Sequence, residues 1–132
     1  MAAVEIRFDR DGLVPCITQD ADTGEVLTLA YMNEESLRIT GETGLVTYFS
    51  RSRQKIWQKG EDSGNLQRVR QLRGDCDGDA IVALVEPAGP ACHTGERTCF
   101  YRDLETGETT EPVNAEALAA LSRTLDQRLA EK

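Results

Sequence analysis

The segment from Asp75 to Glu86 constrains the fold more than any other part of the chain. It begins with Asp75-Cys76-Asp77-Gly78-Asp79 and continues into the nearly unbroken apolar run of residues 80–86. A short apolar run that follows a turn is typical of a buried strand. Gly78 is the residue in the acidic run that most readily adopts a positive φ. We therefore expect a turn over 75–79 that leads into a strand over 80–86.

Other parts of the chain also have strand character, and one has helix character. A turn-rich connection over 21–24 joins the first two strand-like runs. Asn33 can cap a short helix over 34–38, which Gly41 or Gly44 would end. The sequence predicts an α+β fold, mostly antiparallel β, with this one short helix in the N-terminal half. The remaining expected strands are 13–18, 25–31, 45–50, 55–58 and 65–73.

The C-terminal tail, residues 102–132, differs from the rest of the chain. Asn114 follows Pro112 and can cap an amphipathic helix. The apolar stripe of such a helix packs on a core or on a partner subunit. The chain shows no repeat and no linker, so we expect a single domain over 1–132. The stripe consists of Leu118, Leu121, Leu125 and Leu129.

The sequence favours a cytoplasmic location. No apolar run approaches the roughly 20 residues that span a membrane. The first residues have neither the charged lead nor the apolar stretch of a signal peptide. Thiols in a reducing compartment more often serve metal binding or catalysis than disulfides. This expectation applies to all four cysteines.

The charge of the chain is unevenly distributed. The net charge is −8, but the segment 51–73 carries about +5, which leaves the remainder near −13. An acidic protein is repelled by nucleic acid as a whole. The basic segment suits a small anion such as a phosphorylated metabolite. The alternative is a solvated, arginine-rich strand pair.

The three aspartates Asp75, Asp77 and Asp79 indicate a cation site. They would repel one another without a bound cation, and oxygen ligands favour magnesium or calcium. The alternative is a plain acidic turn before the strand. A calcium EF-hand is excluded, because its sixth position must be glycine but is Ala80, and the residues that follow are a strand rather than a helix.

Three cysteines indicate a zinc site. Cys76, Cys92 and Cys99 are separated by 15 and then 6 residues, which matches no CxxC knuckle. Three protein ligands leave one open position on a tetrahedral zinc, which is the catalytic pattern. The fourth cysteine, Cys16, lies in an apolar strand and is expected to be a small core residue. His93, the only histidine, could act as general base on zinc-bound water, ligate the metal, or be a surface residue.

A third group of residues suits phosphate binding. Hydroxyls and guanidiniums alternate in Ser50-Arg51-Ser52-Arg53, and residues 57–65 follow closely. Gly60 and Gly64 would let the backbone approach a ligand. The Walker pattern is absent.

Taken in order, these segments resemble the phosphoribosyl-AMP cyclohydrolase family of histidine biosynthesis, over residues 8–102. Phe49, Asp62 and Cys16 depart from the family pattern, but none of them is an expected metal ligand. The matching stretches are Gly12-Leu-Val-Pro, Thr23-Gly-Glu-Val-Leu, Leu29-Ala-Tyr-Met-Asn-Glu-Glu, Ser50-Arg-Ser-Arg, 57–65, Gln67-Arg-Val, Asp75-Cys-Asp-Gly-Asp, Ala91-Cys-His-Thr-Gly and Cys99-Phe-Tyr-Arg.

The resemblance implies a hydrolase that opens the N1–C6 bond of the adenine ring of 1-(5-phosphoribosyl)-AMP, giving the formimino-aminoimidazole carboxamide ribotide. It implies an obligate homodimer with one zinc and one magnesium per subunit. Cys76 of one subunit would join Cys92 and Cys99 of the other, and magnesium would bind at the three aspartates. Zinc lowers the pKa of its bound water to about 7, and His93 would be the catalytic base. The substrate-binding residues would be Arg51, Ser52, Arg53, Trp57, Lys59, Ser63 and Asn65.

Two rival hypotheses come from other classes of protein. A zinc-stapled binding dimer would explain the three cysteines without His93. A thiol redox protein would use Cys92 and Cys99 as a reversible disulfide. Some members of the family carry a pyrophosphohydrolase domain in the same chain. The residues after Arg102 are too few for such a domain, so we expect that step to belong to another protein.

Overall fold

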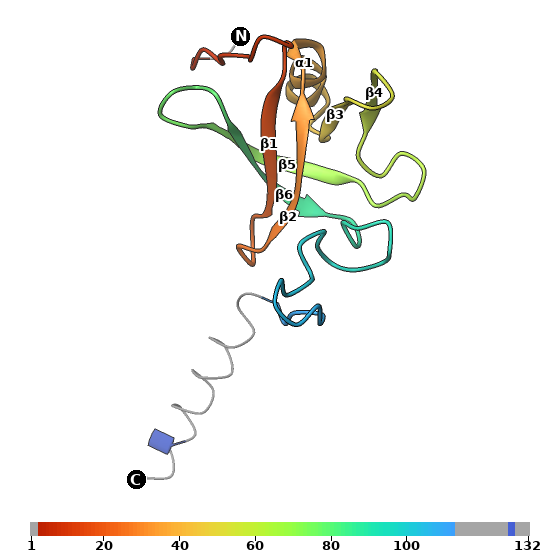
Figure 1. Ribbon diagram of the computed structural model, residues 1–132. Helices are drawn as coiled ribbons and strands as arrows, with labels where there is room; N and C mark the ends of the chain where they lie inside the picture. The colour runs from red at the N-terminus through yellow and green to blue at the C-terminus, as the bar shows by residue number, and fades with distance from the viewer. Residues whose placement is uncertain (1–2, 113–126, 129–132) are drawn as a thin grey trace.

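The computed structural model describes residues 3–112 and 127–128, and its elements follow the predicted order (Figure 1). All six expected strands form, with ends within two residues of those predicted, and the expected helix lies between the second and third strands. The α+β class is therefore confirmed. The elements are β1 (Val14–Asp20), β2 (Val26–Met32), α1 (Glu34–Thr43), β3 (Thr47–Ser50), β4 (Lys55–Gln58), β5 (Gln67–Gly74) and β6 (Ile81–Pro87).

Helix α1 begins where the sequence indicated but is longer than predicted. The side chain of Asn33 accepts a hydrogen bond from the Ser36 backbone N–H, and the Ser36 hydroxyl accepts one from the Asn33 N–H. This reciprocal cap fixes the first turn. The helix passes through Gly41 and ends at Gly44, whose φ of 74° suits a left-handed C-cap. An interior glycine costs only about 1 kcal/mol, so Gly41 does not stop the helix.

The strands form a four-stranded sheet and a separate pair. The order in the larger sheet is β2-β1-β6-β5, and β3 pairs with β4. Three of the four pairings are antiparallel, as predicted, but β1 and β6 run parallel, with Cys16 opposite Ile81. Backbone bonds from Val46 N–H to the Gln67 carbonyl and from Val69 N–H to the Gly44 carbonyl connect the segment before β3 to β5.

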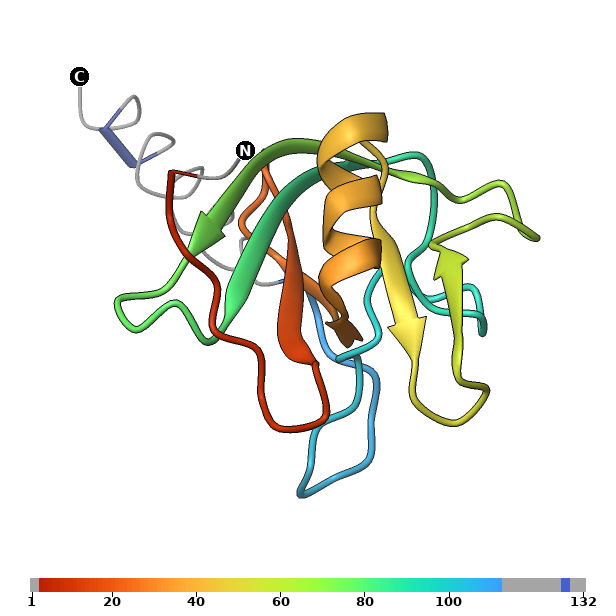
Figure 2. The same cartoon turned by 90° about the horizontal axis from the view of Figure 1, so that it is seen from above.

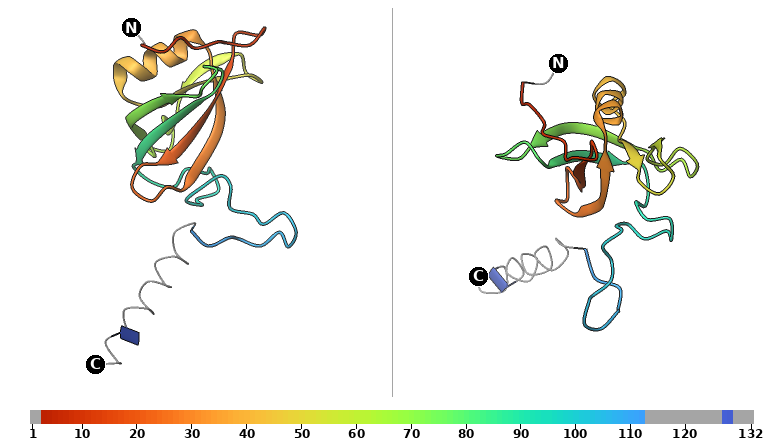
Figure 3. Two further views of the ribbon diagram at one scale, coloured as in Figure 1. Left: turned by 90° about the vertical axis from the view of Figure 1, so that its left-hand side faces the viewer. Right: turned by 45° about the horizontal axis from the view of Figure 1, so that its top comes forward.

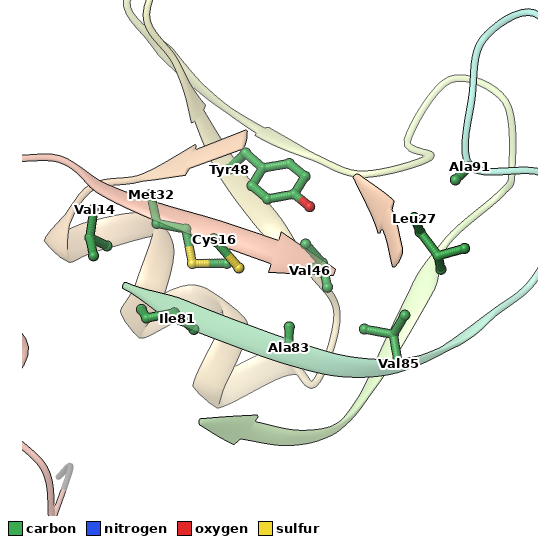
Figure 4. Packing of buried hydrophobic residues seen from close by; sticks show 10 residues of the cluster. All are labelled: Val14, Cys16, Leu27, Met32, Val46, Tyr48, Ile81, Ala83, Val85 and Ala91. Atoms are coloured by element: carbon green, nitrogen blue, oxygen red, sulfur yellow. The ribbon is translucent and has the colours of Figure 1, made fainter. Parts of the chain in front are cut away.

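Helix α1 and the β3–β4 pair lie on the same side of the larger sheet (Figures 2 and 3). The helix packs against β3 and β2. The core fills the space between these layers (Figure 4). The β6 segment is buried at alternate positions only, with Val82 and Leu84 half-buried. Cys16 is fully buried, which confirms its predicted core role. The core residues are Val14, Cys16, Leu27, Met32, Val46, Tyr48, Ile81, Ala83, Val85 and Ala91.

The predicted C-terminal helix falls mainly on residues 113–126 and 129–132, which lie outside the described residues. Among the residues that are described, no helix is long and apolar enough to cross a membrane.

Candidate functional site

Residues 91–99, called here the cysteine loop, follow β6 and run along the outer edge of β2. The Cys99 N–H donates to the Leu27 carbonyl at 2.7 Å. The Thr98 hydroxyl donates to the Val26 carbonyl at 2.6 Å. β2 is an edge strand of the sheet, so its outward carbonyls are available to the loop. These bonds fix Cys99 against the start of β2.

A turn inside the cysteine loop positions Cys92. The Cys92 N–H donates to the Glu96 carbonyl at 3.1 Å, and the Gly95 N–H donates to the Cys92 carbonyl at 3.0 Å. Gly95 has a φ of 91°, a conformation that favours glycine. The turn folds the chain back, so that the buried Cys92 lies beside the exposed Cys99.

Each of these two sulfur atoms contacts a threonine hydroxyl. Thr94 Oγ1 lies 3.1 Å from Cys92 Sγ and donates to it. Thr28 Oγ1 lies 3.3 Å from Cys99 Sγ. Hydrogen bonds from Thr94 hold the pKa of the Cys92 thiol below its usual range, helped by the Cys99 thiol and by the charge of Lys59. The structure therefore brings Cys92 and Cys99 together beside Lys59.

Cys76 lies elsewhere in the chain. It is exposed in the turn between β5 and β6, where its Sγ lies 3.5 Å from Asp77 Oδ1. Strands β5 and β2 are the opposite edges of the sheet (Figure 1), about 14 Å apart at 4.8 Å per strand. Among residues 3–112 and 127–128, no three His, Cys, Asp or Glu side chains gather into a metal-binding group. One chain thus offers two neighbouring thiols, with the third at the far edge of the sheet.

Residues 75–79, called here the acidic turn, pack against the N-terminal segment. Gly78 has a φ of 73°, and a Cβ there would lie 2.5 Å from the Glu5 carbonyl oxygen. The Arg7 N–H donates to the Gly78 carbonyl at 2.7 Å. Glycine is therefore required at this position by both conformation and space.

The carboxyl groups of the acidic turn influence one another. Asp75 Oδ1 accepts a hydrogen bond from the Asp79 N–H at 2.9 Å. A hydrogen bond between the two side chains lowers the pKa of Asp75 and raises that of Asp79, and the charge of Asp77 raises the latter further. Each of these carboxyl groups therefore influences the ionisation of the other. A divalent cation bound between them could relieve the repulsion of the charged forms.

The charge of Lys59 reaches Cys92 and helps to lower the pKa of that thiol, and Trp57 lies beside Lys59. The Trp57 ring packs on the buried Tyr48 ring, with centroids 5.3 Å apart. Burial raises the pKa of Tyr48, so its phenol stays neutral. Lys59 Nζ lies 5.7 Å from the centre of the Trp57 ring. Tyr48 therefore holds Trp57 in place, and Trp57 positions Lys59.

Arg51 lies farther along β2 from the cysteines. Its guanidinium carbon is 4.0 Å from the centre of the Tyr31 ring, a stacking distance. Gln54, in the β3–β4 turn, has a φ of 53°, which is unusual for a residue other than glycine. Ser52 and Arg53 are exposed in the same turn. Arg51 lines a cavity of about 350 Å³ together with Asp11, Leu13, Asn33, Phe49 and Gln54.

The structure shows that Gly60 is needed for packing within its own loop. Its φ is 83°, and an added Cβ would collide with the Asn65 backbone. A Cβ on Gly89 would collide with the Asn65 side chain. Gly60 thus allows close packing within its own loop, and its predicted approach to a ligand stays a prediction. Ser63 is exposed, and its hydroxyl accepts a bond from the Asn65 N–H at 3.2 Å.

His93 directly follows Cys92 and is exposed. Sequence reasoning missed the hydroxyls of Thr28 and Thr94 and the ring of Tyr31. Thr94 lies within the Cys92–Gly95 turn and Tyr31 within a matching stretch, so both had a local signal. Thr28 had none, because its contact with Cys99 joins residues far apart in the chain.

Comparison with known proteins gives a consistent result. Residues 28–101 match the family model described as phosphoribosyl-AMP cyclohydrolase. The chain is 57% identical over 112 residues to the phosphoribosyl-AMP cyclohydrolase of Haloquadratum walsbyi, which covers 85% of each protein. It is 58% identical over 105 residues to that of Archaeoglobus fulgidus, covering 80% of this chain and 97% of the relative.

A longer protein also matches. The histidine biosynthesis bifunctional protein HisIE of Thermus thermophilus is 62% identical over 103 residues. The match covers 78% of this chain but only 48% of the relative. The similarity therefore extends to part of a two-function protein.

Proposed function

The chain belongs to the phosphoribosyl-AMP cyclohydrolase family and is a hydrolase of histidine biosynthesis, and on that premise we propose how its residues perform the reaction. The proposed catalytic centre contains a zinc ion bound by Cys92 and Cys99 of one subunit and Cys76 of a second. One zinc and one magnesium would bind per subunit. Membership of this enzyme family argues against both rival hypotheses, the thiol redox protein and the non-enzymatic binding dimer.

The arrangement of the thiols supports a shared metal site. Cys92 and Cys99 lie together, and each sulfur contacts a hydroxyl. Cys76 is exposed in the turn between β6 and β5, the edge strand opposite β2, where a second copy of the chain can reach it. Thiolates are soft ligands that suit zinc. This separation of two thiols from the third is the observation that carries the proposal of a homodimeric site.

The substrate's own chemistry explains which groups the reaction needs. An adenine alkylated at N1 is cationic, so its C6 is electrophilic. When bound, zinc supplies a Lewis acid that makes hydroxide available near neutral pH. The oxygen bonds to C6, the C6–N1 bond breaks with its electron pair left on N1, and the proton remaining on the C6 oxygen is released to solvent as the carboxamide C=O forms. His93 would take the proton from the attacking water and deliver it to N1.

The positions of the cationic side chains fit a substrate with two phosphate groups. Lys59 lies near Cys92, and Arg51 stacks on Tyr31. Cys99 contacts β2 at Leu27, so Tyr31 is about 13 Å farther along the strand. We propose that one phosphate binds near Lys59 and the other near Arg51, in the cavity beside Asn33. Trp57 would stack against the purine ring. The rest of the proposed binding set is Ser52, Arg53, Ser63 and Asn65.

The acidic turn suits the proposed magnesium site. Asp75, Asp77 and Asp79 provide oxygen ligands only, which is the donor set that magnesium prefers. The Asp79 N–H donates to Asp75 Oδ1 at 2.9 Å, and the two carboxyl groups shift each other's pKa, which supports a site at which their oxygens meet. Cys76 lies inside this turn, so magnesium binding would also order a proposed zinc ligand. Three thiolate ligands require a reducing compartment, which supports the proposed cytoplasmic location.

The direct test follows the ultraviolet absorbance change when purified protein is incubated with phosphoribosyl-AMP, alongside zinc analysis. We expect one zinc per subunit, loss of turnover with a strong chelator, and recovery with zinc plus magnesium. His93→Gln should keep the zinc and lower kcat about 100-fold to 10,000-fold. Full turnover in protein without zinc would refute the metal centre, and wild-type kcat in His93→Gln would remove His93 from the reaction.

A further inference from the structure

Most threonine hydroxyls near the core bond to the backbone. Those of Thr40, Thr47 and Thr98 donate to carbonyl oxygens at 2.6 to 3.1 Å. This is the usual local partner of a threonine hydroxyl. Thr28 and Thr94 differ, because the only hydrogen-bond contact of each hydroxyl among the described residues is a cysteine sulfur.

An irregularity in β2 directs Thr28 toward Cys99. Thr18 pairs with Thr28, but the next residue, Gln19, pairs with Val26, so β2 contains an extra residue. Such a bulge turns the local side chains. Leu27 and Thr28 are consecutive, yet both are buried, with 3% and 7% exposed. Regular alternation would place only one of them inside.

The direction of the hydrogen bonds is fixed once the thiols lose their protons. A thiolate can only accept, so each hydroxyl must donate to it. Thr94 Oγ1 then donates to Cys92 across 3.1 Å and Thr28 Oγ1 to Cys99 across 3.3 Å. Hydrogen bonds to a charged acceptor are stronger than those between neutral groups. Cys76 differs from the other two thiols. Among the described residues, its Sγ has a hydrogen-bond contact with a carboxylate oxygen of Asp77 and none with a hydroxyl.

We propose that Thr28 and Thr94 are positioning residues for the metal ligands. Their hydroxyls donate to the thiolates of Cys99 and Cys92, orient the two sulfur atoms, and withdraw charge from them. This inference rests on the proposed zinc site and deepens it. Groups that orient metal ligands in this way typically contribute about 10-fold to 100-fold in metal affinity or activity.

The test uses cobalt(II) in place of zinc, because thiolate-bound cobalt has a sulfur-to-metal charge-transfer band in the near ultraviolet. A hydrogen bond lowers the energy of the sulfur lone pair. Its loss in Thr28→Val or Thr94→Val should therefore move the band to longer wavelength. Each valine variant should also bind zinc about 10-fold or more weakly in competition with a chelator. Valine keeps the shape of threonine, so packing changes little.

Matched variants separate hydrogen bonding from packing. Thr28→Ser and Thr94→Ser keep the hydroxyl and should keep the wild-type band and zinc affinity. Thr18→Val removes a fully buried hydroxyl directly opposite Thr28 that contacts no sulfur atom in the described structure. This control should leave both readouts unchanged.

The outcomes distinguish the two proposals. Wild-type protein that binds cobalt without a thiolate band would refute the zinc centre itself. Wild-type bands in both valine variants, with unchanged zinc affinity, would refute the role of the threonines alone. Equal shifts in Thr18→Val and Thr28→Val would show a packing effect and also overturn the inference.

Discussion

Arg97 Nε lies 2.7 Å from Glu25 Oε1, and this ion pair connects the cysteine loop to the start of β2. The Glu25 side chain is 8% exposed and that of Arg97 33%. Truncating Arg97 would leave a carboxylate buried without this charge partner. Removing one member of a buried pair costs 3–5 kcal/mol, whereas exposed pairs contribute less than about 1 kcal/mol. The Arg97–Glu25 pair lies between these limits.

We predict that Arg97→Ala lowers the free energy of unfolding by about 2 kcal/mol, measured by urea denaturation. Replacing Glu25 by Gln in the same protein should recover part of this loss. The control is Arg38→Ala, which removes an exposed pair with Glu42 in α1 and should change the free energy by less than about 0.5 kcal/mol. Equal losses in the two arginine variants would contradict the importance of burial.

Gly78 and Gly41 should respond in opposite directions to alanine. Gly78 has a positive φ and no room for a Cβ, whereas an added Cβ on Gly41 meets no atom within 4 Å. Gly78→Ala should destabilise the fold by about 2 kcal/mol or more. Gly41→Ala in the helix interior should stabilise it by about 0.5–1 kcal/mol. Urea unfolding measures both, and a neutral Gly78→Ala would show that the acidic turn does not need its contact with Glu5.

We predict that the buried thiol of Cys16 lowers the free energy of unfolding at alkaline pH. Burial raises the pKa of its thiol from the ordinary 9.0 to about 12. The unfolded chain therefore releases this proton at a lower pH than the folded chain does. The contribution of Cys16 to stability is complete below pH 9 and is lost progressively between pH 9 and pH 12.

Between pH 8 and pH 10, Cys16 should lower the free energy of unfolding by about 1 kcal/mol. Urea denaturation of wild type and Cys16→Ala at both values measures it. The variant should be less stable at pH 8 because it leaves a cavity, but its stability should fall less with pH. Parallel pH profiles for the two proteins would mean that the Cys16 thiol is not protected by burial.

The local elements could be predicted from sequence, whereas the long-range contacts could not. Asn33 marks the start of α1 by itself, since capping depends on neighbouring residues, whereas the sequence left Gly41 and Gly44 both open as its end. The parallel pairing of Cys16 with Ile81 joins segments 65 positions apart in the chain, and periodicity does not carry that information. The bulge that turns Thr28 inward is a property of the β1–β2 register, so no pattern in β2 alone indicated it.

The same distinction applies to the candidate site. The residue types of Cys76, Cys92 and Cys99 indicate zinc, but their spacing does not say which of them share a chain. In the described structure Cys76 lies in the β5–β6 turn and does not gather with the other two thiols. A shared site makes a specific prediction for dimers that contain two different mutant subunits.

We predict that Cys76→Ser and Cys92→Ser subunits are inactive alone but form a partly active heterodimer. In that heterodimer, one of the two sites contains both mutations and is inactive. The other combines the intact Cys76 of one subunit with the intact Cys92 and Cys99 of its partner. One of two sites then works, so a heterodimer purified through two different tags should show about half the wild-type turnover and one zinc per dimer.

The matched control pairs Cys92→Ser with Cys99→Ser subunits. Both mutations then damage the same half of the site, so neither site of the heterodimer has a complete set of thiols, and turnover should stay at the level of the single variants. Recovery in this control would mean that Cys92 and Cys99 belong to different sites, against their contacts within one chain. If the Cys76→Ser and Cys92→Ser heterodimer stayed inactive while folded and dimeric, Cys76 would not act across the interface, and all three thiols would have to meet within a single chain.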